Sequence, residues 1–115
     1  MAYLLAGLAL IVVAGAVAYR LMPEQLSVRA DVYRVCRDFT AAKLKAPATA
    51  VFPNLKDLER LRDYGFKKDD GRAYELLGYV DSENSFGAML RTDFSCAVER
   101  RGRSWVGSST LTPRD

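Results

Sequence analysis

The 115-residue sequence contains no histidine. This absence excludes haem or chlorophyll bound through histidine, catalysis by Ser-His-Asp or Cys-His groups, and most zinc sites. There are only two cysteines, Cys36 and Cys96, and their spacing matches no CxxC motif, c-type haem site or cysteine-rich metal site. The sequence also lacks a glycine-rich phosphate loop and a nucleophile elbow. We therefore expect no enzymatic activity, no catalytic residues, no cofactor and no bound metal.

Charged side chains are missing from the first 19 residues, although the whole chain has 17 Lys and Arg and 14 Asp and Glu. As a helix, the apolar run from Ala2 to Tyr19 would span about 27 Å, close to the hydrocarbon thickness of a bilayer. It predicts a transmembrane anchor over residues 1–22, a small domain over residues 23–111 and a tail over residues 112–115. The alternative is a signal peptide cleaved after Ala16-Val17-Ala18. A retained anchor is favoured because no basic residue precedes the run, which is also long for a signal peptide.

Small residues on the predicted anchor would let a neighbouring membrane helix approach closely. These residues are Ala2, Ala6, Gly7, Ala9, Ala14, Ala16 and Ala18. Alternatively, they are present only because small apolar residues are common in anchors. If they do pack, the expected partners are other membrane-protein subunits, with the lipid bilayer around them.

Two signals disagree about the side of the membrane on which the domain lies. Basic residues follow the anchor and none precedes it, which favours the cytoplasm, although this rule weakens for long translocated domains. Cys36 and Cys96 form either two buried free thiols or one disulfide, and a disulfide persists only in an oxidising compartment. A bridge across this loop would contribute about 4 kcal/mol. We favour the oxidising side.

Two segments of the domain have the apolar periodicity of helices. Residues 23–45 predict an amphipathic helix that must end before Pro47, because the residue preceding a proline avoids helical geometry. Residues 54–64 predict a short helix with Asn54 as its N-cap. Residues 67–71 predict a polar turn.

From Arg72 the apolar period changes to two, which predicts three antiparallel strands over residues 73–81, 86–100 and 104–111. On the middle strand, alternate residues are expected to face the core: Phe86, Ala88, Leu90, Phe94, Cys96 and Val98. The predicted fold class is α+β, with one N-terminal transmembrane helix followed by an amphipathic helix packed on a three-stranded antiparallel sheet. A helix lying across the sheet would bring Cys36 close to Cys96.

Several short segments resemble a small domain found in bacterial and phage lipoproteins and membrane-anchored proteins. They follow the pattern LKxPxTAxF…GYVDxxNSFGA…R…FxC after an upstream cysteine, and comprise Cys36, residues 44–52, residues 78–81, residues 84–88, Arg91, Phe94 and Cys96. Members usually lie beyond the inner membrane and have no assigned activity. The resemblance covers residues 33–105 and implies fold and compartment, which supports the disulfide. Ala46 and Ala48 replace the usual serines.

Four arginines, Arg91, Arg100, Arg101 and Arg103, form a predicted basic cluster on the middle strand and the turn after it. They would suit an acidic protein partner or anionic lipid headgroups. An ordinary solvated surface is the alternative. Nucleic acid is not an expected partner, because the net charge is only +3 and no nucleic-acid-binding motif is present.

Three carboxylates near the first predicted hairpin, Asp81, Glu83 and Asp93, raise the question of a cation site. Their spacing does not match a calcium-binding loop. Asp and Asn side chains commonly accept hydrogen bonds from nearby backbone groups in turns, which explains residues 81–84 without a metal.

These features predict a non-catalytic, single-pass accessory subunit that scaffolds or stabilises a larger membrane complex, for example a photosynthetic, respiratory or secretion complex. The expected location is the bacterial inner membrane, with the C-terminal domain on the periplasmic side. The alternative function is a membrane-tethered periplasmic binding or inhibitor module.

Overall fold

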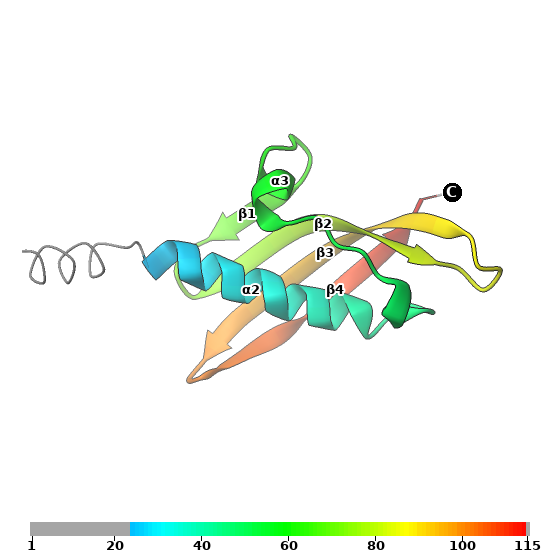
Figure 1. Cartoon of the computed structure of the whole chain (residues 1–115). Helices are drawn as coiled ribbons and strands as arrows, with labels where there is room; N and C mark the ends of the chain where they lie inside the picture. Colours follow the sequence, from blue (N-terminus) through cyan, green and yellow to red (C-terminus); the bar gives the residue numbers. More distant parts are fainter. Residues whose placement is uncertain (1–23, 115) are drawn as a thin grey trace, which may run out of the picture.

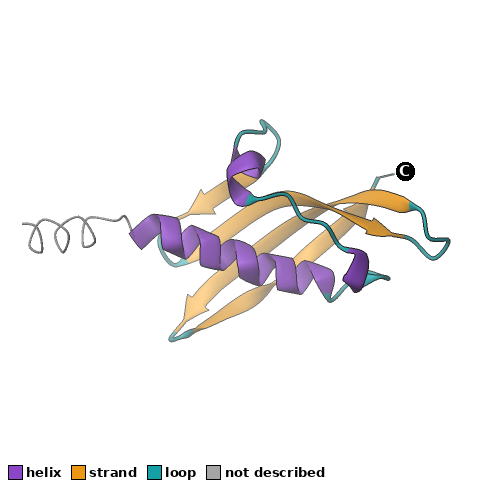
Figure 2. Ribbon diagram, viewed as in Figure 1, coloured by secondary structure: helices purple, strands orange, loops and turns teal. Residues whose placement is uncertain are grey.

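The computed structural model describes residues 24–114, in which one long helix covers one face of a four-stranded antiparallel sheet (Figure 1). The strands lie side by side in chain order. Figure 2 shows the helical layer in front of the sheet. The elements are α2 (Glu24–Ala41), the 3-10 turn η1 (Pro47–Thr49), α3 (Leu55–Glu59), β1 (Gly65–Asp69), β2 (Ala73–Glu83), β3 (Met89–Arg101) and β4 (Ser104–Pro113).

The sheet has four strands, so the predicted three-stranded sheet was wrong. The additional strand is β1, which includes part of the segment predicted as a polar turn and pairs with β2. Lys67, Lys68 and Asp69 are all exposed on this edge strand, and only Gly65 is fully buried. No alternation of apolar and polar residues is therefore visible in its sequence. At the other edge, β4 extends to Pro113, into the residues predicted as a tail.

The predicted fold class also included a transmembrane helix, and this part needs correction too. Within residues 24–114, no helix is long and apolar enough to cross a membrane. Helix α2 is the longest, and it carries an exposed polar face that includes Arg34 and Asp38. The predicted anchor over residues 1–22, with its small packing residues, lies outside the described residues.

Helix α2 packs on the sheet through one apolar stripe. Its buried residues recur at spacings of one helical turn and are Val32, Tyr33, Cys36 and Thr40. On the opposite face, Arg34 forms ion pairs with Asp31 and Asp38, three and four residues away. The helix stops at Ala41, earlier than predicted, and residues 42–46 form the turn that leads to Pro47.

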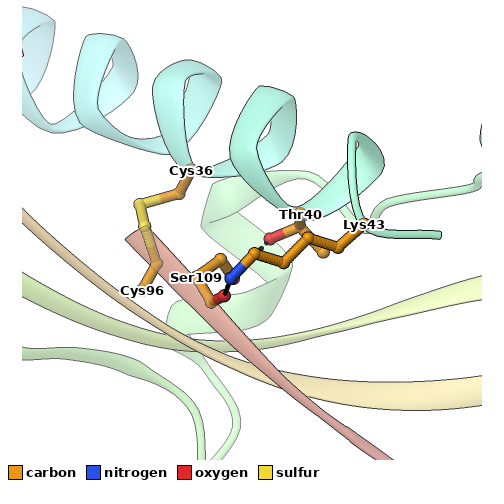
Figure 3. The surroundings of a disulfide bond; sticks show 5 residues. All are labelled: Cys36, Thr40, Lys43, Cys96 and Ser109. Carbon is orange, nitrogen blue, oxygen red and sulfur yellow. Dashed lines mark hydrogen bonds between the residues drawn. A yellow bond between two sulfur atoms is a disulfide. The ribbon is translucent and has the colours of Figure 1, made fainter. Parts of the chain in front are cut away.

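The predicted disulfide between Cys36 and Cys96 is confirmed, and it joins α2 to β3 (Figure 3). Both cysteines are fully buried, with their Cα atoms 5.8 Å apart. One helical turn later, Thr40 Oγ1 and Ser109 Oγ of β4 share a buried hydrogen bond of 2.8 Å. Lys43 Nζ donates a hydrogen bond to the backbone carbonyl oxygen of Ser109. The helix is thus attached to two adjacent strands by covalent and polar contacts as well as by apolar packing.

The core lies between α2 and the central part of β2 and β3. It includes Leu76, Val80 and Phe94, all at most 3% exposed. Phe94 is paired with Gly78, and its ring lies directly over that glycine. A Cβ atom on Gly78 would come within 2.4 Å of the ring, so a side chain at this position would displace Phe94.

Candidate functional site

The turn between β2 and β3 is held by its own backbone and by one side chain. Asn84 Oδ1 accepts hydrogen bonds from the backbone N–H groups of Phe86 and Ala88, at 2.9 and 3.0 Å. The backbone of Asn84 also donates to the carbonyl of Ala88 and accepts from Gly87. Gly87 has φ of 80°, which favours glycine. The turn is therefore built by Asn and Gly chemistry, and Asn84 accepts backbone hydrogen bonds as expected of an Asn in a turn.

This turn presents an apolar surface to solvent. Phe86 is 94% exposed, Met89 52% and Leu90 44%. We call these three residues the apolar tip. The expectation that Phe86, Ala88 and Leu90 face the core was wrong, because all three are exposed. The hairpin extends past the end of α2 (Figure 1), so α2 does not cover its inner face there.

An open groove of about 310 Å³ lies at the base of the apolar tip. Leu44, Leu90, Leu111 and Pro113 supply its apolar lining, and Lys43, Lys45 and Glu83 contribute charged side chains. From Asn84 to Leu90 the chain carries no charge. An exposed aromatic ring beside an apolar groove is typical of a surface that binds another molecule.

The predicted carboxylate group does not form a cation site within the described residues, where no cluster of three metal-binding side chains occurs. Asp81 accepts two hydrogen bonds from Arg91, at 2.9 and 3.0 Å, which lower the pKa of the Asp81 carboxyl. Asp93 accepts a hydrogen bond from Arg114 at 2.9 Å and another from the Tyr64 hydroxyl at 2.7 Å. Burial, followed by this hydrogen bond to Asp93, raises the pKa of Tyr64. Both carboxylates are thus held by neighbouring donors.

The structure separates the four predicted partner-binding arginines. Arg91 lies near the start of β3 and Arg101 at its end, about 30 Å apart along an extended strand. The Arg91 guanidinium also lies 4.0 Å from the centroid of the Tyr79 ring, so this arginine is engaged within the domain. Arg100, Arg101 and Arg103 remain together at the β3–β4 turn.

The sequence pattern does not reveal two candidate features of the surface. Its period of two places Phe86 on the middle strand, although Asn84 and Gly87 on either side of it indicate a turn. Nothing local in the sequence links Lys43 to Ser109, which is 66 residues away.

Comparisons of the chain with known protein families, with curated proteins and with solved structures find no match. The resemblance that covers residues 33–105 therefore stays a prediction, and the function has to be argued from the geometry of the surface.

Proposed function

We propose that this chain is a non-catalytic accessory subunit of a larger membrane complex, acting on the periplasmic side of the bacterial inner membrane. In this proposal the apolar tip is the surface that binds a protein partner. The observation that carries the proposal is the 94% exposure of Phe86 on a turn held by hydrogen bonds.

The apolar tip supports a protein partner on energetic grounds. Burying a fully exposed phenylalanine side chain is worth about 2 kcal/mol, and Met89 and Leu90 would add to this gain. The Asn84 hydrogen bonds fix the turn before binding, so little conformational entropy is lost when the partner closes over the ring. Aromatic residues that fill a partner's pocket are frequent anchors of interfaces.

The disulfide supports the proposed compartment. Cys36 and Cys96 are fully buried in the bond between α2 and β3. Such bonds form and persist outside the reducing cytoplasm. Basic residues follow the predicted anchor and none precedes it, which argues for the opposite side, but that rule is weak for long translocated domains.

We propose a non-catalytic role because the chain lacks the side chains that most often act as nucleophile or general base. The chain has no histidine, and both of its cysteines are in the disulfide. Asp81 accepts two hydrogen bonds from Arg91, which lower the pKa of its carboxyl and leave it a poor proton donor.

The test is photocrosslinking of the full-length chain in its native membrane. A photoreactive phenylalanine analogue is placed at position 86 and, as a matched control, at exposed Leu61 near α3. We expect position 86 to crosslink to one protein of constant mass, whereas position 61 does not. Phe86→Ala should abolish stoichiometric co-purification of that protein in mild detergent, whereas Leu61→Ala should preserve it.

Crosslinks from position 86 to lipid alone, or a full-length chain that purifies by itself as a monomer, would contradict the accessory-subunit proposal. A partner that crosslinks at position 86 but never co-purifies would instead favour the tethered binding or inhibitor module.

A further inference from the structure

The two edges of the sheet differ in how they are protected from pairing with another strand. Strand β1 is short, carries Lys67, Lys68 and Asp69 exposed, and has an irregular register between Phe66 and Lys68. Charges, short length and irregular register are the usual means by which proteins block an edge strand. In contrast, β4 (Ser104–Pro113) is ten residues long and has no charged side chain.

The direction of the backbone groups on β4 follows from two observations. The backbone N–H of Arg114 donates a hydrogen bond to the backbone carbonyl oxygen of Arg91 on β3. Because backbone groups alternate in direction along a strand, the even-numbered residues of β4 direct their N–H and C=O groups toward β3. Odd-numbered residues then direct their N–H and C=O groups to the outer edge. The contact of Lys43 with the carbonyl of Ser109 agrees with this assignment.

Only part of this outer edge is open. Ser109 is fully buried and its carbonyl is occupied by Lys43, so an incoming strand cannot pair there. The longer open part precedes Ser109 and is the segment Ser104–Ser108, which we call the open edge. Trp105 and Gly107 each present one N–H and one C=O on it, and within residues 24–114 no side chain donates to or accepts from these groups. Figure 1 shows the β3–β4 turn projecting beyond α2. The Trp105 side chain still contacts that helix, because its Nε1 donates a hydrogen bond of 2.8 Å to Asp31 Oδ2.

Basic side chains lie at both ends of the open edge. Arg101 and Arg103 are exposed at the turn before it, and Lys43 lies at Ser109 after it. Elsewhere on the sheet, Arg72, Arg91 and Arg114 are paired with carboxylates. In the part of the chain that the structure describes, no ion pair with a carboxylate is formed by Arg101, Arg103 or Lys43.

A second copy of this chain is a poor occupant of the open edge. Antiparallel pairing of two copies with Trp105 opposite Gly107 would place Arg103 of one copy opposite Ser109 of the other. Lys43 donates a hydrogen bond to the carbonyl of Ser109. The pairing would therefore place Arg103 of each copy close to Lys43 of the other, so that like charges meet at both ends of the paired segment. The same basic groups would attract a strand that carries carboxylates.

We propose that the open edge binds an extended, acidic segment of a partner protein, which adds to the sheet as a fifth strand beside β4. The backbone of the segment bonds to Trp105 and Gly107, and its carboxylates lie near Arg101, Arg103 and Lys43. Main-chain bonds of this kind supply affinity, and the side chains supply selectivity. This surface lies at the opposite end of the hairpin strands from the apolar tip, so the inference goes beyond the proposed function.

The test uses the full-length chain and capped peptides of alternating valine and glutamate, about seven residues long. We expect binding to slow hydrogen exchange at the amides of Trp105 and Gly107, as measured by NMR. Arg101→Glu with Arg103→Glu should weaken binding about tenfold or more. The matched control is Arg60→Glu with Arg62→Glu, two exposed arginines beyond α3, which should leave the affinity unchanged.

Peptides with methylated backbone nitrogens test the main-chain bonds. In an added strand, every second residue directs its backbone N–H toward β4. Methylation of those nitrogens should abolish binding, whereas methylation of the nitrogens of the residues in between should leave binding unchanged. The proposal is overturned if the glutamate peptide does not bind, if a lysine analogue binds equally well, if both methylation phases behave alike, or if the protection lies elsewhere. Phe86→Ala should bind the peptide normally, so failure here is distinguishable from failure of the apolar tip.

Discussion

Phe94 and Phe86 belong to the same β2–β3 hairpin, yet Phe94 is 3% exposed and Phe86 is 94% exposed. Phe94 lies in the half of the hairpin that α2 covers, near the disulfide. Phe86 lies in the turn between β2 and β3, and this turn extends past the helix (Figure 1). Residues with the same place in an alternating pattern therefore stabilise the fold in one half and form a surface in the other.

The largest expected effect concerns the covered half, where the disulfide holds α2 on the sheet. Replacing both cysteines, C36S/C96S, should lower the free energy of unfolding by about 4 kcal/mol, because the unfolded chain is then no longer constrained by the bridge. Urea denaturation followed by fluorescence of Trp105, the single tryptophan, measures this loss.

A reductant provides the control for the disulfide prediction. It should destabilise the wild-type chain to a similar degree and leave C36S/C96S unchanged. A loss below about 1 kcal/mol would mean that packing alone holds the helix in place, and that the covered half does not depend on the bridge.

The two phenylalanines themselves give the most direct comparison. Phe94→Ala should lower the free energy of unfolding by about 3 kcal/mol, because it leaves a cavity under α2. Phe86→Ala should change it by less than about 0.5 kcal/mol, as for other surface positions. Urea denaturation of both variants under the same conditions checks this. Equal losses would show that the tip is packed in solution and would remove the basis for treating it as a binding surface.

The smallest expected effect is electrostatic and concerns the uncovered half. Arg91 lowers the pKa of Asp81, so the pair contributes stability above the ordinary aspartate pKa of about 3.9, and this contribution is lost as the pH falls through the lowered value. Both side chains are a third or more exposed, so the contribution is below about 1 kcal/mol.

Asp81→Asn tests this pair. It should lower stability slightly at neutral pH and reduce the loss of stability that the wild-type chain shows between about pH 5 and pH 2. Arg72→Gln, which removes an exposed pair with Glu99 at the other end of β2, is the matched control and should not reduce the contribution of Asp81. Identical pH profiles for Asp81→Asn and wild type would contradict the prediction.

Much of the covered half could be predicted from the sequence. The three- and four-residue spacing of the apolar residues marks α2, and the period of two marks β2, β3 and β4, because these periods follow from helix and strand geometry. Strand β1 was not predicted because its side chains are mostly exposed and charged, so its sequence shows no alternating pattern. It forms a strand through its backbone pairing with β2.

The candidate surfaces were less predictable than the fold. The arginines at the β3–β4 turn were predicted as a basic cluster, but Arg91 lies about 30 Å from Arg101 along the extended strand β3. Arg91 pairs with Asp81 across the hairpin instead. The exposure of Phe86 depends on where α2 ends relative to the hairpin, and this relation joins segments far apart in the chain. Spacing along the sequence carries no information about such coverage.

The amphipathic helix, the alternating strands and the turn signals of Asn84 and Gly87 can be recognised from the sequence, since each depends on neighbouring residues. The contact of Cys36 with Cys96, the contact of Lys43 with the β4 edge and the exposure of Phe86 follow instead from how α2 packs on the sheet. The physical reason is that burial and pairing depend on which distant element lies over a residue, and this is fixed only when α2 packs on the sheet.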